Sequence, residues 1–351
     1  MAPATVKLSD VAARAGVHPA TVSRALSERT RHMVNATTAE RVLAAASELG
    51  YTPNPIARSL KTNRSFTVAV LLPDLTNPLF PPMVRGVEDA LAEAGFTALI
   101  ANTDNHPDRA LAALETMRIR QADGCIAATA TRDDGMLADA AGDMPMVLIN
   151  RRVYTHSIPA VVGDDRSGVG QAVEHLAALG HERIAHVAGP QWLSTGADRH
   201  EAFVEALRRV GLDPDPGLIS FSEGFTEEQG AKSLNALLEA GREFTALVAG
   251  NDLMALGCYD ALAERGLSCP DDVSIVGFND MPFADKFNPP LTTVRIPHYE
   301  MGRRAAELLL ERLAGDGSGQ SEDIVLPVEL VQRASTAPAP SRRARRAASE
   351  S

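Results

Sequence analysis

Leu8-Ser-Asp-Val-Ala-Ala-Arg-Ala-Gly16 and Val17-His-Pro-Ala-Thr-Val-Ser-Arg-Ala-Leu26 form the stretch that decides the fold of the N-terminal part. Residues 8–15 are predicted to form a short helix capped by Ser9, with Asp10 in the first turn, where the helix dipole favours an anion. Gly16 can adopt the left-handed conformation that ends a helix. Pro19 suits the first turn of a second helix, because its missing N–H needs no partner there. Two short helices joined by a glycine turn are typical of a helix-turn-helix unit.

A third helix is predicted from its cap at Asn35 to Leu49, with Gly50 ending it and Tyr51 packing beneath it. The two helices of the first pair would be held together by the small apolar residues Val11, Ala15, Val17, Val22 and Leu26. Ala20, Thr21, Ser23 and Arg24 would then lie on the outer side, where they can reach a DNA major groove. The alternative is a small three-helix bundle with no role in DNA binding.

The charge of the chain is unevenly distributed. The net charge is −11, yet residues 1–65 hold nine Lys and Arg against four Asp and Glu. The last twelve residues hold four Arg and one Glu, which leaves −19 on residues 66–339. A basic head on an acidic body favours nucleic-acid binding by the head alone.

Composition excludes several other classes of protein. The chain has 351 residues, of which 45% are apolar and 23% charged, as in a soluble globular protein of two or three domains. Three scattered cysteines exclude a disulfide framework and a CxxC metal site. The N-terminus lacks the apolar region of a secretory signal, and no apolar run approaches membrane-spanning length. We therefore expect a cytoplasmic protein.

The motifs of the head, taken together, closely resemble those of the LacI/GalR family of bacterial transcriptional regulators. They are the stretch 8–26, Ala44-Ala-Ala-Ser-Glu-Leu-Gly-Tyr51-Thr-Pro-Asn-Pro and Ala57-Arg-Ser-Leu60, and the resemblance continues to about residue 336. His18 departs from the family pattern, which has Ser or Thr there, although an imidazole can still cap a helix or contact a phosphate. Together with the reading of the residues, the resemblance predicts DNA contacts at Thr5, Ser9, His18, Pro19, Ala20, Thr21, Ser23, Arg24, Asn35, Tyr51, Asn54, Ala57, Arg58, Leu60 and Lys61.

Residues 52–65 are expected to be a hinge. Asn54 can cap and Pro55 can start a helix that is too short to be stable alone. The resemblance implies that this hinge helix pairs with its dimer mate in the minor groove, where Leu60 wedges between base steps. The alternative is a plain linker in which Leu60 packs on the next domain.

Strands and helices alternate from Phe66 onward. Strands are predicted at 67–72, 97–101, 124–128, 146–150, 183–188, 218–221, 246–249 and 274–278, and helices at 83–94, 108–121, 167–179, 195–210, 226–240, 253–265 and 299–314. Such alternation is typical of parallel sheets covered on both faces. The predicted fold is an all-α helix-turn-helix head plus an α/β periplasmic-binding-protein-like body of two doubly wound parallel-sheet subdomains. The stretch 163–170 lacks a GK[ST] ending and is interpreted as a turn before a helix capped by Ser167.

Ligands of such folds bind beyond the carboxyl ends of the strands. The strand-end loops hold the aromatic residues Phe80, Trp192 and Phe225 beside Asn, Asp and Arg, a combination that suits a polyhydroxylated ligand. The resemblance matches effector-site residues to Leu79, Phe80, Asn150, Thr195, Arg199, Phe225, Asn251 and Asn279. The alternatives are that the polar residues only cap helices and that Trp192 only packs on the surface.

The predicted boundaries are a head at 1–51, a hinge at 52–65, a body at 66–336 and a disordered basic tail at 337–351. Within the body, the first subdomain is expected to hold 66–163 with 295–323, and the second 164–291 with 324–336. The strand 291–297 is expected to return to the first subdomain.

We therefore expect a homodimeric transcriptional regulator, a repressor, that binds a double-stranded DNA operator under the control of a sugar-like effector. The sequence shows no catalytic constellation, no metal-ligand spacing and no cofactor motif, so we expect no enzyme, metal or cofactor. The alternatives are a sugar-binding protein without operator specificity and an α/β enzyme acting on a sugar or nucleotide.

Overall fold

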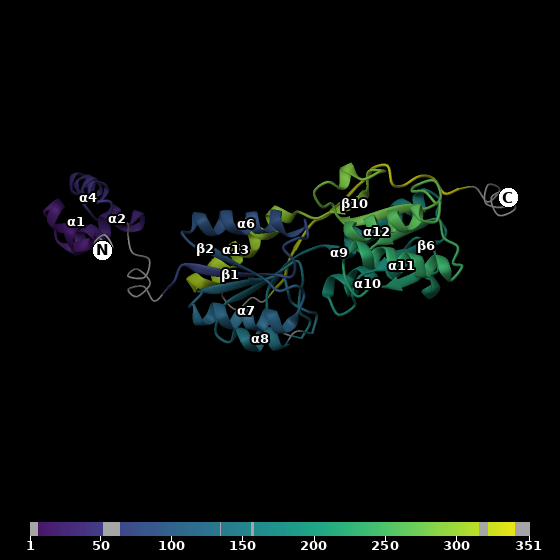
Figure 1. The fold of residues 1–351 in the computed structure, drawn as a ribbon, viewed down its shortest axis with the longest axis horizontal. Coiled ribbons are helices and arrows are strands. Elements are labelled where there is room, and N and C mark those ends of the chain that lie inside the picture. The colour runs from purple at the N-terminus through teal and green to yellow at the C-terminus, as the bar shows by residue number, and fades with distance from the viewer. Residues whose placement is uncertain (1–5, 52–63, 134, 156–157, 316–321, 341–351) are drawn as a thin grey trace. The chain divides into compact units, whose positions relative to one another are not determined.

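The computed structural model describes residues 6–51, 64–133, 135–155, 158–315 and 322–340 (Figure 1). The chain forms two compact units, Met1–Ser65 and Phe66–Ser351. No helix in these described ranges is long and apolar enough to cross a membrane.

The head is built from short helices around small apolar side chains. Its described helices are α1 (Leu8–Ala15), α2 (Pro19–Leu26), α3 (Glu28–Arg31) and α4 (Ala36–Glu48). Val11, Val22 and Val42 are fully buried where α1, α2 and α4 meet, and Tyr51 packs against the same cluster. Because these side chains are small, α1, α2 and α4 can pack closely against one another. The helix-turn-helix pair thus has the predicted bounds, whereas the one-turn helix α3 was not predicted.

Two capping interactions differ in how well the sequence predicted them. The Ser9 cap is wrong: α1 starts at Leu8, and the Asp10 carboxylate instead accepts the Lys7 backbone N–H at 2.8 Å. An acidic residue in the third position reaches back to the first free N–H, and Ser9 lies too far inside the helix to do so. The imidazole of His18 does cap α2, since its Nδ1 accepts the Ala20 N–H at 3.2 Å.

The first half of the body is a six-stranded parallel sheet in the order β11-β5-β4-β3-β1-β2. Its elements are β1 (Thr67–Leu72), α6 (Phe80–Glu93), β2 (Thr97–Asn102), α7 (Pro107–Ile119), β3 (Gly124–Ala127), α8 (Gly135–Ala141), β4 (Met146–Ile149), β5 (Ala160–Gly163), α13 (His298–Ala314) and β11 (Ile324–Leu326). Helices α6 and α13 cover one face of this sheet, and α7 and α8 the other (Figure 1). Val68 and Val70 of β1 pack in the cluster with α6 and α13, and Ala69 and Leu71 in the cluster with α7 and α8. Both faces are covered, which is why this strand is a continuous apolar run.

The second half repeats the plan in the order β12-β10-β9-β8-β6-β7, with only β12 antiparallel among the described strands. Its elements are α9 (Asp165–Ala178), β6 (Ile184–Ala188), α10 (Ser194–Arg209), η1 (Pro216–Leu218), β7 (Ile219–Phe221), α11 (Glu227–Glu239), β8 (Ala246–Ala249), α12 (Asp252–Ala263), β9 (Ser274–Asn279), η2 (Ala284–Lys286), β10 (Thr292–Arg295) and β12 (Glu329–Val331). The Ser167 cap is wrong, because Asp164 caps α9 and its side chain accepts the Ser167 N–H at 2.9 Å.

Two short strands were assigned to the wrong subdomain. The segment Thr292–Arg295 does not return to the first subdomain: β10 pairs with β9 of the second sheet. Ile324–Leu326, placed with the second subdomain, pairs with β5 of the first. Residues 337–340 are also not a free tail, since the Ala337 N–H donates to Ser274 Oγ and the Ala339 N–H to the Leu179 carbonyl. Residues 341–351 of the predicted tail lie outside the described residues.

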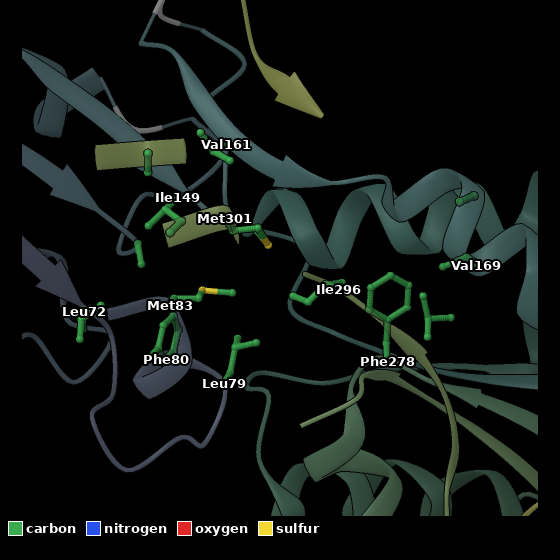
Figure 2. Packing of buried hydrophobic residues seen from close by; sticks show 14 of the residues in the cluster. Leu72, Leu79, Phe80, Met83, Ile149, Val161, Val169, Phe278, Ile296 and Met301 are labelled. Carbon is green, nitrogen blue, oxygen red and sulfur yellow. The ribbon is translucent and has the colours of Figure 1, made fainter. Parts of the chain in front are cut away.

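The chain crosses between the subdomains after β5, after β10 and after β11, and the three crossings touch. A Cβ added to Gly163 would lie 3.3 Å from side-chain carbons of both Ile296 and Val328. Figure 2 shows Ile296 between Met83 and Met301 of the first subdomain and Phe278 of the second. A narrow apolar hinge of three crossings therefore joins the two subdomains.

Candidate functional site

Most of the described residues that were predicted to contact DNA are exposed on the head. His18, Pro19, Ala20 and Arg24 are exposed, whereas Thr21 and Ser23 are half-buried. Ser9 and Asn35 are exposed too, and Asn35 also caps α4 by accepting the Thr37 N–H at 3.0 Å. Tyr51 differs from these because it is partly buried against the head core. Thr5, Asn54, Ala57, Arg58, Leu60 and Lys61 lie outside the described residues.

A cleft between the two subdomains of the body measures about 700 Å³, counting the space open to solvent. The structure brings all nine residues of the predicted effector site to its walls: Leu79, Phe80, Asn150, Trp192, Thr195, Arg199, Phe225, Asn251 and Asn279. The first three belong to the first subdomain and the other six to the second. A ligand here would touch both subdomains at once.

Backbone conformation directs several amides to this cleft. Asn105, Asn150 and Asn279 line it, and their φ angles are +56°, +67° and +114°. Asn150 directly follows β4 and Asn279 ends β9, so the chain turns sharply where each strand stops. Asparagine enters the left-handed region more readily than most residues with a side chain. These strained strand ends are consistent with a binding function.

Apolar and capping residues make up much of the remaining wall. Leu79 and Phe80 begin α6 and are buried in the core cluster as well as bordering the cleft (Figure 2). Trp192 is 42% exposed, which leaves its indole surface available to a ligand. Asn251 caps α12, because its Oδ1 accepts the Met254 N–H at 2.9 Å. The capping role predicted as an alternative is therefore present, in addition to its place in the cleft.

Arg199 is the central polar residue of the second subdomain. Its guanidinium donates from Nε to Asp165 at 3.0 Å and from Nη1 to the Gly250 carbonyl at 2.8 Å. It also lies 3.8 Å from the centre of the Phe278 ring. Burial raises the pKa of Asp165, and the charge of Arg199 acts against that rise. Arg199 is only 4% exposed, so its side chain is held in one orientation beside the cleft.

Arg151 was not among the predicted site residues, although it lines the same cleft and is 5% exposed. Its Nη2 donates to the side-chain oxygen of Asn105 at 3.2 Å. Its Nε is buried and has no hydrogen-bond partner among the residues that the structure describes. Burial, with a smaller contribution from the charge of Arg199, lowers the pKa of Arg151 to about 10, so it remains a cation at neutral pH. The one signal in the sequence was its position directly after Asn150 at a strand end.

The two walls of the cleft are also linked outside it. Arg152 of the first subdomain donates to Asp198 of α10 at 2.8 Å, and its backbone N–H donates to Ser194 Oγ at 3.0 Å. The Tyr154 hydroxyl donates to the same Asp198 carboxylate. We refer to Arg152, Tyr154, Ser194 and Asp198 as the clasp.

Known protein families match the head and the body of this chain separately. Residues 7–54 match the family described as bacterial regulatory proteins, lacI family, and residues 173–336 match a periplasmic binding protein-like domain. The HTH-type transcriptional repressor CytR of Escherichia coli K12 is 35% identical, covering 94% of this chain and 96% of that protein.

Two solved structures share nearly the whole fold. The lac repressor dimer bound to operator and the anti-inducer ONPF has a TM-score of 0.83 at 28% identity, covering 95% of this chain and 99% of that one. The transcriptional regulator CelR in complex with cellobiose has a TM-score of 0.72 at 32% identity, covering 94% and 99%. With a helix-turn-helix head, a cleft between two doubly wound subdomains and near full-length similarity to such proteins, this chain belongs to the lacI family of DNA-binding bacterial transcriptional regulators.

Proposed function

We propose that the protein is a dimeric repressor whose affinity for a near-palindromic operator is set by a sugar-like effector bound in the cleft. The observation that carries this proposal is the convergence of the nine predicted effector residues on one cleft, in a chain that also holds a helix-turn-helix head. Similarity to the lac repressor and to the CelR–cellobiose complex supports both halves of the proposal.

DNA recognition would be divided between the head and the hinge. Exposed Arg24, with Thr21 and Ser23 on the same short helix, would read base edges in the major groove. Leu60, outside the described residues, would wedge into the minor groove at the operator centre. Two copies are needed because each head covers only one half-site.

An exposed apolar edge supports the dimer. Strand β2 forms one edge of the first sheet, and its Leu99 and Ile100 are 37% and 41% exposed. Apolar edge strands left open to solvent promote pairing with other chains, so native proteins usually protect them. The similar lac repressor is a dimer on its operator, and we assign this edge of the body to contact with a second copy.

Closure of the cleft between the two subdomains would control how tightly the head binds the operator. A ligand that contacts both subdomains stabilises the closed arrangement, and it alters operator affinity only if it binds two conformations unequally. The three touching crossings allow the subdomains to rotate about the hinge without breaking either sheet.

The proposal is tested by selecting random DNA duplexes with the purified full-length protein, alone and with each member of a panel of sugars and nucleosides. An enriched palindrome that is lost or gained with one sugar supports the proposal. Enrichment that no compound alters would refute the effector half, and the absence of enrichment in every condition would refute the DNA half. Steep loss of binding with added salt is expected, because phosphate contacts release counterions.

A further inference from the structure

The charges that border the cleft are not balanced. Arg199 is paired with Asp165, but no carboxylate among the described residues lies within ion-pair distance of Arg151. Within the described part of the chain, Nη2 is the only donor atom of the Arg151 guanidinium that has a hydrogen-bond partner, and that partner is the neutral Asn105 amide. A buried guanidinium is thus left without a counter-charge beside a space that a ligand can fill.

Two carboxylates outside the lining of the cleft, Asp198 and Asp252, already have partners. Asp198 accepts from Arg152 and Tyr154 in the clasp. Asp252, behind the cleft wall, accepts the Met281 N–H at 2.7 Å and the Thr293 hydroxyl at 2.5 Å. Four neutral amides line the cleft together with Arg151, namely Asn105, Asn150, Asn251 and Asn279, and Asn105 accepts from it. Two acidic residues do line the cleft, but Glu223 is exposed and Asp74 is half-buried, so solvent screens both.

An uncompensated buried charge costs far more free energy than a surface one, because it has lost its hydration. A protein retains such a charge where a ligand supplies the missing partner, and a guanidinium binds carboxylate or phosphate through two parallel hydrogen bonds. Neutral hydroxyls could satisfy the hydrogen bonds of Arg151 but not its charge.

We propose that the effector is a sugar derivative carrying one anionic group, a carboxylate or a phosphate, which pairs with Arg151. This inference rests on the proposed function, because it specifies the chemical class of the effector in the same cleft. The anion would lie against the first subdomain beside Asn105, and the sugar ring would extend toward Trp192 and Phe225 of the second.

The first experiment needs no knowledge of the sugar. The full chain, Arg151→Met and Arg151→Lys are melted in inorganic phosphate and in chloride at equal ionic strength. Phosphate is expected to raise the Tm of the parent by about 2–4 °C relative to chloride, to raise that of Arg151→Lys by less, and to give Arg151→Met no such rise. Arg118→Met is the control, because Arg118 is an exposed residue of the same subdomain paired with Glu115. An equal phosphate effect in parent and Arg151→Met would overturn the inference.

The second experiment separates the two sources of charge by calorimetric titration. Ribose is compared with ribose 5-phosphate, and glucose with glucuronate and glucose 6-phosphate. One anionic member is expected to bind at least about tenfold more tightly than its neutral parent, and Arg151→Met should remove that preference while neutral-sugar binding changes less. Whether the carboxylate or the phosphate series shows the preference identifies the anionic group.

The outcomes distinguish the inference from the function on which it rests. Neutral sugars that bind as tightly as their acids and phosphates, and that lose as much affinity in Arg151→Met, would overturn the inference and leave the proposed function standing. If no sugar of either kind binds or alters operator affinity, the proposed function fails as well.

Discussion

Arg199 connects Asp165 of α9, the carbonyl of Gly250 and the ring of Phe278 through one buried guanidinium. Replacing it with alanine would leave the Asp165 carboxylate buried without a partner and would endanger the fold itself. Arg199→Lys keeps a cation there but loses the planar fork. We expect this variant to bind the effector about 10- to 100-fold more weakly while its operator affinity without ligand is unchanged. Calorimetric titration and fluorescence anisotropy on labelled operator measure the two quantities.

Arg166→Lys is the matched control for this prediction. Arg166 follows Asp165 on α9, is largely exposed and pairs with Glu205 outside the cleft. Surface pairs of this kind contribute little, so neither affinity should change. An Arg199→Lys protein with parental effector affinity would show that Arg199 only supports the wall.

His186 predicts a pH dependence of stability. It is buried in β6, its ring stacks on Phe203 with centroids 4.6 Å apart, and its Nδ1 lies 2.8 Å from the Val248 carbonyl. Burial lowers its pKa from 6.5 to about 4, so the folded state holds it neutral. Below pH 6.5 the unfolded chain binds a proton that the folded chain does not. The contribution of neutral His186 to the free energy of unfolding is therefore fully present above pH 6.5. It is lost as the pH falls toward 4, by up to about 3 kcal/mol.

The difference between the parent and His186→Gln isolates this contribution. His298, whose pKa burial also lowers to about 4, adds a loss in the same pH window, but it is present in both proteins. Denaturant unfolding between pH 4 and 7.5 should show a shallower acid loss in His186→Gln than in the parent. If the free energy of unfolding fell equally with pH in the two proteins, protonation of His186 would not destabilise the folded state.

At the residue scale, the sequence predicted which residues line the cleft better than it predicted which charged side chains there lack a partner. Asn150 and Asn279 could be placed because strand ends of parallel sheets converge and because the family resemblance identified them. Arg151 lies at the same strand end as Asn150 but was left out of the predicted effector set, because an arginine after a strand is common and its role depends on which carboxylates lie near it in space. That information belongs to the tertiary structure alone. The Ser9 cap failed for a related reason, since Asp10 competes for the same helix end and only geometry decides between them.

Helices α6 and α13 cross at two glycines, and this crossing limits what the first subdomain tolerates. A Cβ on Gly302 would lie 1.9 Å from the Met83 carbonyl oxygen, and one on Gly86 would lie 2.0 Å from that of Tyr299. Because both obstacles are backbone, neither helix can yield without moving as a whole. Gly302→Ala gains about 1 kcal/mol of helix propensity but forces the helices apart. We expect a net loss of at least about 2 kcal/mol in the free energy of unfolding, measured in urea.

Glu311→Ala serves as the comparison on the same helix. Glu311 is an exposed residue of α13, so its replacement should change stability by less than about 0.5 kcal/mol. If Gly302→Ala were as stable as Glu311→Ala, the close approach of the two helices would not exist in solution.

Longer elements were predicted better than short ones: the six-residue β2 was found although much of it is exposed, and the buried four-residue β5 was missed. Strand β1 has its predicted bounds because Thr67–Leu72 is apolar on both faces. The one-turn helix α3 and the seven-residue α8 carry too few periodic positions to be recognised. Strands β10 and β11 were misassigned because four and three residues are compatible with either sheet. Which sheet each of these strands joins depends on where the chain crosses the hinge, and that is a property of the tertiary structure.

At the scale of the whole body, the clasp and the hinge depend differently on whether the cleft is closed. The hinge consists of the chain's own crossings, whereas the contacts of Arg152 with Asp198 and Ser194 join the two subdomains only while these surfaces face each other. A rotation that opens the cleft separates the donors from the acceptors. We therefore expect the clasp to stabilise the closed body even without a ligand.

Arg152→Met tests this stabilisation. An ion pair of this exposure contributes about 1 kcal/mol, so the variant should populate the open body more and bind the effector about three- to tenfold more weakly. Arg303→Met is the control, because Arg303 is about as exposed and pairs with Glu93 inside the first subdomain. Its effector affinity should stay within twofold of the parent. Equal affinities for the parent and Arg152→Met would show that the clasp does not report closure.

The same variant decides the direction of control without any ligand. An effector that favours the closed body and releases the operator implies that the open body binds DNA better, so ligand-free Arg152→Met should bind operator more tightly than the parent. If the effector instead recruits the protein to DNA, the same substitution should weaken operator binding. Coupling between the two sites is reciprocal, so the sign found with ligand-free protein must match the sign of the effector's own effect on operator affinity. A mismatch would mean that closure of the cleft and reading of the operator are not parts of one equilibrium.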